Sequence, residues 1–252
     1  IPAVPVRRER LRIGEPTPKV RTFIEGFDEA LGGGIPEGSI VLISGSAGAM
    51  KSTLAYYILY TNVLSRGAKC LYITLEQTLS SLLRQMSEMG MDPIATGGSL
   101  RMFDMGFIRK HIGKSKKSWF KLFLKNIDNM RSQEAFEIMV IDSLEALEVL
   151  ANFKNRRADL FRLFEWLRDM EITAFIITER SDCPFGKHLS HLRNEEEFLA
   201  DGIINLALHS INEIDVQRRI RCFKMRGTKH EPGYLSLMWD DGKFKVTKAV
   251  GR

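Results

Sequence analysis

Residues 44–53 read Ser-Gly-Ser-Ala-Gly-Ala-Met-Lys-Ser-Thr, a phosphate-binding loop with one departure from the usual pattern. In the pattern GxxxxGK followed by Ser or Thr, backbone N–H groups surround a triphosphate. The lysine contacts its β and γ oxygens, and the hydroxyl binds Mg²⁺. Gly45, Lys51 and Ser52 fall in register, but Met50 stands where the second glycine belongs. The loop therefore predicts nucleotide binding, and Met50 leaves open whether hydrolysis follows.

The sequence on both sides of the loop supports this prediction. Residues 40–43 are an apolar, β-branched run typical of a buried strand, and after the loop apolar residues recur at helical spacing until Gly67. A phosphate loop needs a strand before it and a helix after it, because the helix N-terminus carries partial positive charge. A glycine-rich turn that carries a lysine by chance is the alternative.

Length and composition indicate an ordinary globular chain. The 252 residues, 44% hydrophobic and 27% charged, suit one α/β domain. We expect an extended, Pro- and Arg-rich arm at residues 1–20 and a single ATP-binding domain at residues 21–252. No apolar run approaches the ~20 residues of a membrane helix, the residues that follow Ile1 do not have the pattern of a secretory leader, and the three cysteines are widely spaced. We therefore expect a cytoplasmic protein with no membrane contact.

Strands and helices alternate along most of the chain, which predicts an α/β fold with a mostly parallel sheet covered by helices on both faces. After the loop, strands are expected at 69–75, 100–103, 136–142 and 173–178, and helices at 80–89, 118–130 and 158–170. The pattern changes after Gly202. Consecutive strands at 203–208, 219–225, 234–239 and 244–247 predict an antiparallel extension of the sheet edge.

Two of the expected strands end in a carboxylate beside the phosphate loop. Asp142 follows the strand at 136–142, where an acid holds the Mg²⁺ shell of phosphate-loop proteins. Glu76 follows the strand at 69–75, where a water-activating base would lie. An exposed loop acid is the alternative for Glu76.

Two cations, Lys224 and Arg226, are expected on the same face of a late strand. They need an anionic partner or water, and the γ-phosphate held by a neighbouring subunit is a chemically suitable partner. The net charge of +6 is clustered at residues 7–12, 109–117 and 218–229. Together with a loop at 181–193, these clusters suggest weak affinity for single-stranded nucleic acid, with a solvated surface as the alternative.

Several motifs in order resemble the KaiC-like branch of the RecA/RadA ATPase superfamily, over about residues 20–250. They are GFDEALGGGIPEG at 26–38, YITLEQ at 72–77, VIDS at 140–143, TER at 178–180, EEFLADG at 196–202 and KMRGTKH at 224–230. The resemblance implies a RecA-like core that binds ATP and Mg²⁺ between subunits of a ring, usually a hexamer, or of a filament. Lys224 and Arg226 would act across that interface, with Glu76 as the catalytic base. The implied nucleotide contacts are Gly45, Ser46, Ala47, Gly48, Ala49, Met50, Lys51, Ser52, Thr53, Asp142 and Asp240, with Ser52 and Asp142 at the metal.

Two positions depart from the family pattern. Gln77 stands where a second acid usually follows the base, and Met50 replaces the last loop glycine. A left-handed backbone at Met50 would add strain of about 1–2 kcal/mol. The interpretation is a slow Mg-dependent ATPase, active at subunit interfaces, with a role in DNA recombination and repair or in regulation. The alternative is a non-hydrolysing, nucleotide-sensing scaffold in which ATP only stabilises an assembly.

Overall fold

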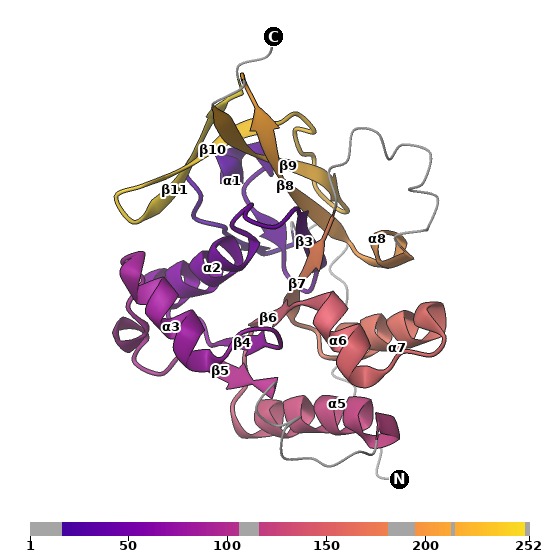
Figure 1. The fold of residues 1–252 in the computed structure, drawn as a ribbon. Helices are drawn as coiled ribbons and strands as arrows, with labels where there is room; N and C mark the ends of the chain where they lie inside the picture. The colour runs from indigo at the N-terminus through magenta and orange to yellow at the C-terminus, as the bar shows by residue number, and fades with distance from the viewer. Residues whose placement is uncertain (1–16, 106–115, 181–194, 213–214, 250–252) are drawn as a thin grey trace.

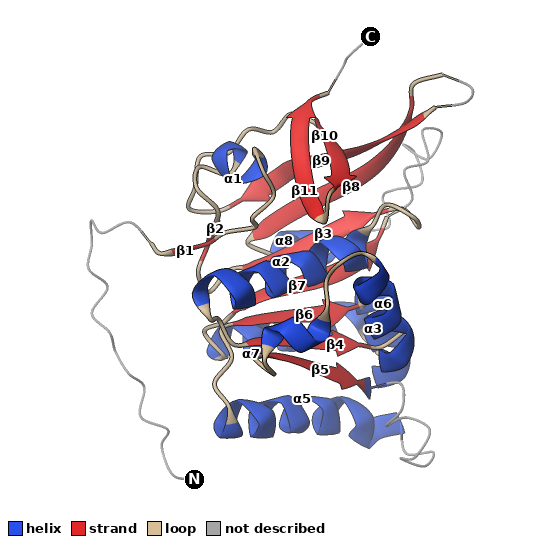
Figure 2. Ribbon diagram, turned by 90° about the vertical axis from the view of Figure 1, so that its left-hand side faces the viewer, coloured by secondary structure: helices blue, strands red, loops and turns tan. Residues whose placement is uncertain are grey.

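The computed structural model of the chain describes residues 17–105, 116–180, 195–212 and 215–249. Its main feature is a nine-stranded sheet in the order β11-β10-β9-β8-β3-β7-β6-β4-β5, flanked by helices (Figures 1 and 2). The predicted α/β class, with a mostly parallel sheet and an antiparallel C-terminal extension, is confirmed.

The six strands from β5 to β8 are all parallel to one another. They are β3 (Ile40–Gly45), β4 (Cys70–Thr74), β5 (Leu100–Asp104), β6 (Ile138–Asp142), β7 (Thr173–Glu179) and β8 (Gly202–Ser210). The central strands read as nearly continuous apolar runs, because helices bury both of their faces. The parallel direction brings their carboxyl ends to one edge of the sheet, which is where ligands bind in such folds.

The last three strands run antiparallel at the other side of β8. They are β9 (Val216–Met225), β10 (Leu235–Asp240) and β11 (Lys243–Lys248). A separate two-stranded sheet pairs β1 (Lys19–Val20) with β2 (Ile35–Pro36). The meander after Gly202 therefore extends the sheet edge as predicted.

The helices form two layers, one on each face of the sheet. One core cluster packs under α2 (Lys51–Arg66) and α3 (Leu79–Glu88), and the other packs under α5 (Lys116–Gln133), α6 (Leu144–Ala151) and α7 (Arg156–Asp169). The remaining short helices are α1 (Phe27–Ala30), the 3₁₀ turn η1 (Pro93–Thr96) and α8 (Glu195–Leu199). Helix α2 ends where Gly67 takes the left-handed conformation, with φ 66°, as the sequence predicts.

Some expectations fall on residues outside this description. They include most of the arm at 1–20, the basic cluster at 7–12, most of the cluster at 109–117, and all of the loop at 181–193. No helix within the described ranges combines the length and hydrophobicity needed to cross a bilayer.

Candidate nucleotide site

A cavity of about 360 Å³ opens at the carboxyl edge of the parallel strands, between the phosphate loop and the ends of β4, β6 and β7. It collects residues that are far apart in the sequence. The lining residues are Ala47, Gly48, Ala49, Met50, Lys51, Ser52, Thr53, Glu76, Gln77, Gln85, Asp142, Ile177 and Glu179. The fold thus brings the predicted loop, base and metal-shell acid to one place.

The start of the phosphate loop is fixed by the neighbouring strand. Gly45 pairs with Leu206 of β8, and a Cβ at position 45 would meet the carbonyl oxygen of Leu206. Only glycine lets the two backbones approach this closely. At the other end of the loop, the buried Lys51 donates hydrogen bonds to the carbonyl oxygens of Gly45 (2.9 Å) and Ser46 (3.0 Å). The lysine therefore lies folded over its own loop.

Met50 is the residue immediately before α2, and its backbone is left-handed, with φ 71° and ψ 29°. This is the conformation for which glycine is preferred, so the methionine carries the strain expected of a Cβ there. Its side chain is half-buried and packs against the core cluster under α2. The residue therefore combines a strained backbone with a packed side chain.

Asp142 lies at the end of β6, nearly buried, within a small hydrogen-bonded group. The hydroxyl of Tyr72 donates to Asp142 Oδ2 at 2.5 Å, and the Ser52 side chain contacts the same carboxylate. Burial raises the pKa of Asp142, while the hydrogen bonds from Tyr72 and Ser52 act in the opposite direction. These hydrogen bonds offset part of the free-energy cost of burying the Asp142 carboxylate.

Glu76 lies just beyond β4, where its carboxylate accepts a hydrogen bond from Ser143. The same serine hydroxyl is the N-cap of α6 and accepts from the backbone N–H of Ala146 at 3.4 Å. One residue thus joins the predicted base to the start of a helix. This fixes where the carboxylate of Glu76 lies relative to the loop.

Lys224 lies near the end of β9 and Arg226 directly follows that strand, and both contact the segment at the end of α8 and before β8. Lys224 donates to the carbonyl oxygens of Glu197 (2.8 Å) and Ala200 (2.6 Å). Arg226 forms an ion pair with Asp201 at 3.0 Å and donates to the carbonyl oxygen of Phe198 at 3.2 Å. Neither cation lines the cavity of its own chain.

Asp240 does not line the cavity either. It is exposed at the end of β10, where Lys245 pairs with it at 3.3 Å. The structure therefore does not bring Asp240 together with the loop in one chain.

Several site residues escaped the sequence reasoning. Tyr72 and Ser143 hold the two carboxylates, and Gln85, Ile177 and Glu179 complete the wall of the cavity. A tyrosine in the middle of an apolar strand was the available signal for Tyr72. The wall residues come from two elements, α3 and β7, that only the tertiary fold places side by side.

The donor set suits a magnesium ion that arrives with a nucleotide. In the described part of the chain, no group of three or more His, Cys, Asp or Glu side chains could hold a metal by itself. A hydroxyl at Ser52 beside the carboxylate of Asp142 matches the way Mg²⁺ is usually bound, by few protein ligands together with phosphates and water.

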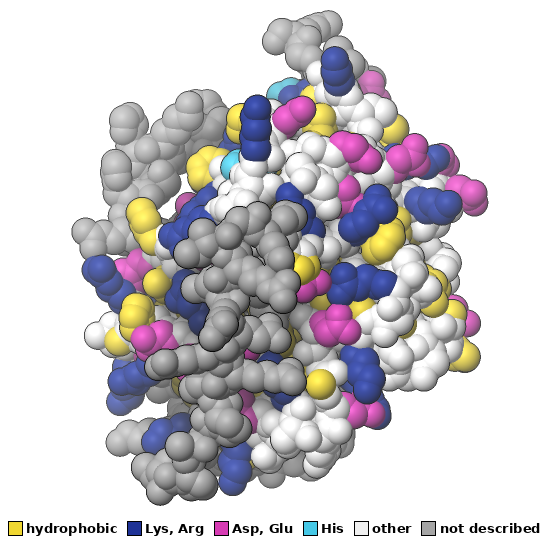
Figure 3. Space-filling view, turned by 180° about the vertical axis from the view of Figure 1, so that it is seen from behind, with side chains coloured by type: hydrophobic (Ala, Val, Ile, Leu, Met, Phe, Trp, Pro, Cys, Tyr) yellow, Lys and Arg dark blue, Asp and Glu magenta, His cyan; other side chains and the backbone are white. Residues whose placement is uncertain are grey.

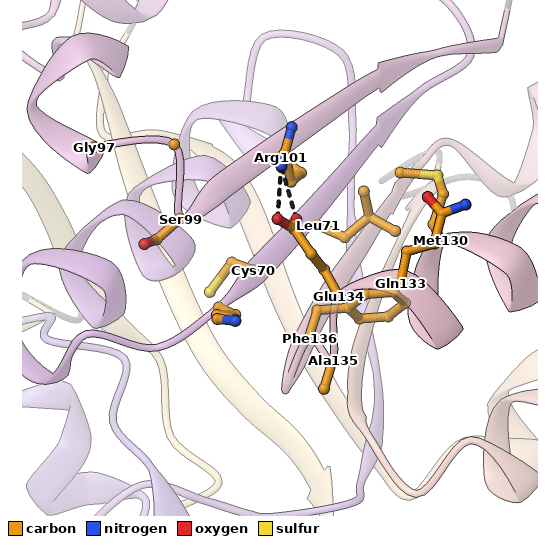
Figure 4. Close-up of a pocket in the computed structure, with 12 residues that line it drawn as sticks. Cys70, Leu71, Gly97, Ser99, Arg101, Met130, Gln133, Glu134, Ala135 and Phe136 are labelled. Carbon is orange, nitrogen blue, oxygen red and sulfur yellow. Dashed lines mark hydrogen bonds and ion pairs between the residues drawn. The ribbon is translucent and has the colours of Figure 1, made fainter.

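A larger cavity, of about 590 Å³, lies at the opposite edge of the sheet, beside the amino ends of β4 and β6. Figure 4 shows its charged pair, in which Arg101 and Glu134 form two hydrogen bonds of 2.7 and 2.8 Å. Those hydrogen bonds lower the pKa of Glu134, so the two charges satisfy each other. None of the predicted nucleotide residues lines this cavity, and the smaller one is the better candidate.

Comparisons with known proteins show the family to which the sequence is similar. The sequence model of the family described as ATPase: KaiC matches residues 20–249. The chain is 28% identical over 247 residues to the circadian clock oscillator protein KaiC 1 of Synechocystis sp., covering 95% of this chain and 47% of that protein. It is 29% identical over 230 residues to KaiC of Parathermosynechococcus lividus, covering 89% and 42%. The chain thus spans about half the length of these curated relatives.

A solved structure is also similar. The crystal structure of a KaiC-like protein from the archaeon Pyrococcus horikoshii OT3 superposes with a TM-score of 0.76 at 27% identity. The match covers 92% of this chain and all of that one.

Proposed function

The chain belongs to the KaiC family of ATPases, and on that basis we propose that it binds Mg-ATP in the 360 Å³ cavity and hydrolyses it slowly between subunits. The observation that carries the proposal is the meeting of Lys51, Ser52, Asp142 and Glu76 at one cavity. We further propose that residues 21–252 act as a single ATP-binding domain in the cytoplasm, preceded by the arm at 1–20.

Each residue of the site has a distinct role in this proposal. Lys51 exchanges the carbonyl oxygens of Gly45 and Ser46 for phosphate oxygens. Glu76 accepts the proton of the attacking water, and Ser143 holds it in position. Mg²⁺, when bound at Ser52 and Asp142, neutralises charge on the phosphates.

The charge of the cavity supports hydrolysis at a subunit interface. Among the described lining residues, Lys51 is the only cation, whereas Glu76, Asp142 and Glu179 are acids. A triphosphate needs more positive charge than this, and the described residues of one chain do not supply it at the cavity. We therefore propose that Lys224 and Arg226 reach the phosphates held by the next subunit of a ring, a hexamer in the family pattern, or of a filament.

A non-hydrolysing scaffold is the second candidate, favoured by the strained Met50 and by Gln77 at the cavity wall. In that case ATP would bind and stabilise the assembly without turnover. The two candidates share the binding step and differ in phosphate release, so a phosphate-release assay on assembled protein separates them.

Mg-ATP is expected to raise the melting temperature through Lys51 and Ser52. When ATP is present at a hundredfold excess over its Kd, binding stabilises the folded state by about 2.7 kcal/mol, which a thermal-shift measurement detects readily. Lys51→Ala should lose the shift, because the buried ammonium is the phosphate contact. Lys69→Ala, beside the larger cavity, is the matched control and should keep it. An equal shift in Lys51→Ala would refute the assignment of the loop.

We also propose a role in DNA recombination and repair or in regulation, with weak affinity for single-stranded nucleic acid. Support comes from β9, where Arg218 is exposed and Arg221 lies over the rings of Phe223 (5.0 Å) and Tyr234 (4.4 Å). On the face seen in Figure 3, however, Lys and Arg are interspersed with Asp and Glu, which favours weak binding.

Such binding is expected to be independent of sequence and to fall steeply with salt, because it releases counterions. Fluorescence anisotropy of a labelled single strand at low and high salt measures it. Arg218→Glu should weaken the binding further. Absence of binding at low salt, or the same affinity at both salt concentrations, would rule out the nucleic-acid role.

A further inference from the structure

Tyr72 is a fully buried phenol in the middle of β4. It faces the layer of α2, where its ring centroid lies 6.0 Å from that of Tyr56, and it is paired in register with Val140 of β6. Its two neighbours on the strand, Leu71 and Ile73, are apolar and completely buried. A phenylalanine would fill the same space, so packing does not require the hydroxyl.

The hydroxyl has a specific partner. It donates to Asp142 Oδ2 at 2.5 Å, and it also interacts with the side chain of Ser52. It therefore contacts both residues that would hold the metal, from the core side of the site. A hydrogen bond to one carboxylate oxygen fixes the rotation of the whole group.

Tyr56 provides a comparison within the same core. Its hydroxyl is buried and has no hydrogen-bond partner among the described residues, although its ring lies beside that of Tyr72. The two neighbouring tyrosines thus differ in their hydroxyl groups, because that of Tyr72 contacts Asp142 and Ser52. Since the buried hydroxyl of Tyr56 makes no such contact, burial in this core does not by itself explain the hydrogen bond between Tyr72 and Asp142.

We propose that Tyr72 is a positioning residue that orients Asp142 toward the magnesium ion of bound Mg-ATP. This inference rests on the proposed function. Residues that hold a metal ligand in place set its orientation, and their loss typically lowers metal affinity about 10–100-fold. Tyr72 does not line the nucleotide cavity, so in this proposal it acts through Asp142, the carboxylate to which it donates.

The experiment measures the Mg²⁺ affinity of the complex with a fluorescent ATP analogue. In Tyr72→Phe, the apparent Mg²⁺ affinity is expected to fall about tenfold, whereas binding of the analogue without Mg²⁺ stays unchanged. Tyr56→Phe, the matched control, should retain the wild-type Mg²⁺ affinity. An unchanged Mg²⁺ affinity in folded Tyr72→Phe would overturn the inference.

A double-mutant cycle tests whether Tyr72 acts through Asp142. Adding Tyr72→Phe to Asp142→Asn is expected to cause no further loss of Mg²⁺ affinity. A further tenfold loss would show a separate effect and contradict the positioning role. Absence of Mg-ATP binding in the wild-type protein would instead refute the proposed function, so the two failures are distinguishable.

A measurement on the wild-type sequence covers the case in which Tyr72→Phe does not fold. Fluorotyrosine labelling marks the five tyrosines, and phenylalanine substitution of the other four identifies the ¹⁹F resonance of Tyr72 by elimination. Adding Mg²⁺ to the ATP complex should shift this resonance, because the accepting carboxylate changes partners. A resonance that does not move would overturn the inference.

Discussion

Arg226→Ala is expected to lower ATP turnover in assembled protein about 10³-fold, while ATP binding changes little. An arginine that reaches a neighbour's γ-phosphate stabilises charge in the transition state, and such residues contribute on the order of 10³–10⁵ in rate. Phosphate release at saturating ATP measures the effect, on material sized by light scattering. Arg218→Ala is the matched control and should leave turnover unchanged, because Arg218 is an exposed arginine on β9, the strand that Arg226 follows.

Mixing two inactive variants tests whether the contribution comes from the neighbouring subunit. Subunits with Arg226→Ala retain Glu76, and subunits with Glu76→Gln retain Arg226. At a mixed interface, one complete site therefore forms, and part of the activity should return. Turnover per subunit that stays constant on dilution to monomers would show that Arg226 does not act in this way.

Met50→Gly is expected to raise the rate of ATP hydrolysis up to about a hundredfold, and to raise ATP affinity much less. In the proposed function, Lys51 and Ser52 would hold the ground-state phosphates whatever residue stands at position 50. Glycine adopts the observed φ of 71° without strain and allows closer approach of the backbone, which refines the placement of the γ-phosphate. A misplacement of about 1 Å can cost on the order of a hundredfold in rate.

Met50→Ala separates the backbone from the side chain. Alanine removes the methionine side chain from the core cluster but keeps the Cβ, and therefore the strain, at the left-handed position. We expect kcat to rise in Met50→Gly and to stay near wild type in Met50→Ala, with Kd nearly constant in both. Equal kcat values in wild type and Met50→Gly would make Met50 a neutral variant of the motif.

The arrangement of the sheet could be predicted because its signals are local. The strands at β3, β4, β6 and β7 are apolar runs bounded by turns, and the change of pattern after Gly202 marked the antiparallel extension. Helix α6 was missed, although Ser143 caps it and its leucines repeat at helical spacing. Only Ser143 separates this helix from β6, and so short a connection contains no turn that would mark the end of the strand in the sequence.

The site could be predicted only where a motif placed its residues. Lys51, Ser52, Glu76 and Asp142 come from strand ends and a loop with a known geometry. The partner of Asp142 could not be predicted, because it depends on the register between β4 and β6, which pairs Tyr72 with Val140. The internal contacts of Lys224 and Arg226 likewise depend on how α8 meets β8.

Lys224 and Arg226 already hold the segment at 197–201 of their own chain. Under the proposed function, engagement of a neighbour's phosphate would be an exchange, since Arg226 would have to give up Asp201 and Phe198 to make it. The nucleotide of one protomer and the docking of this segment in the next would then compete for the same side chains. Such coupling is reciprocal, so an interaction that strengthens the docking of the segment would weaken ATP binding in the adjacent protomer by the same factor. Each protomer would thereby report its neighbour's nucleotide state, which is the basis of cooperative behaviour around an assembly.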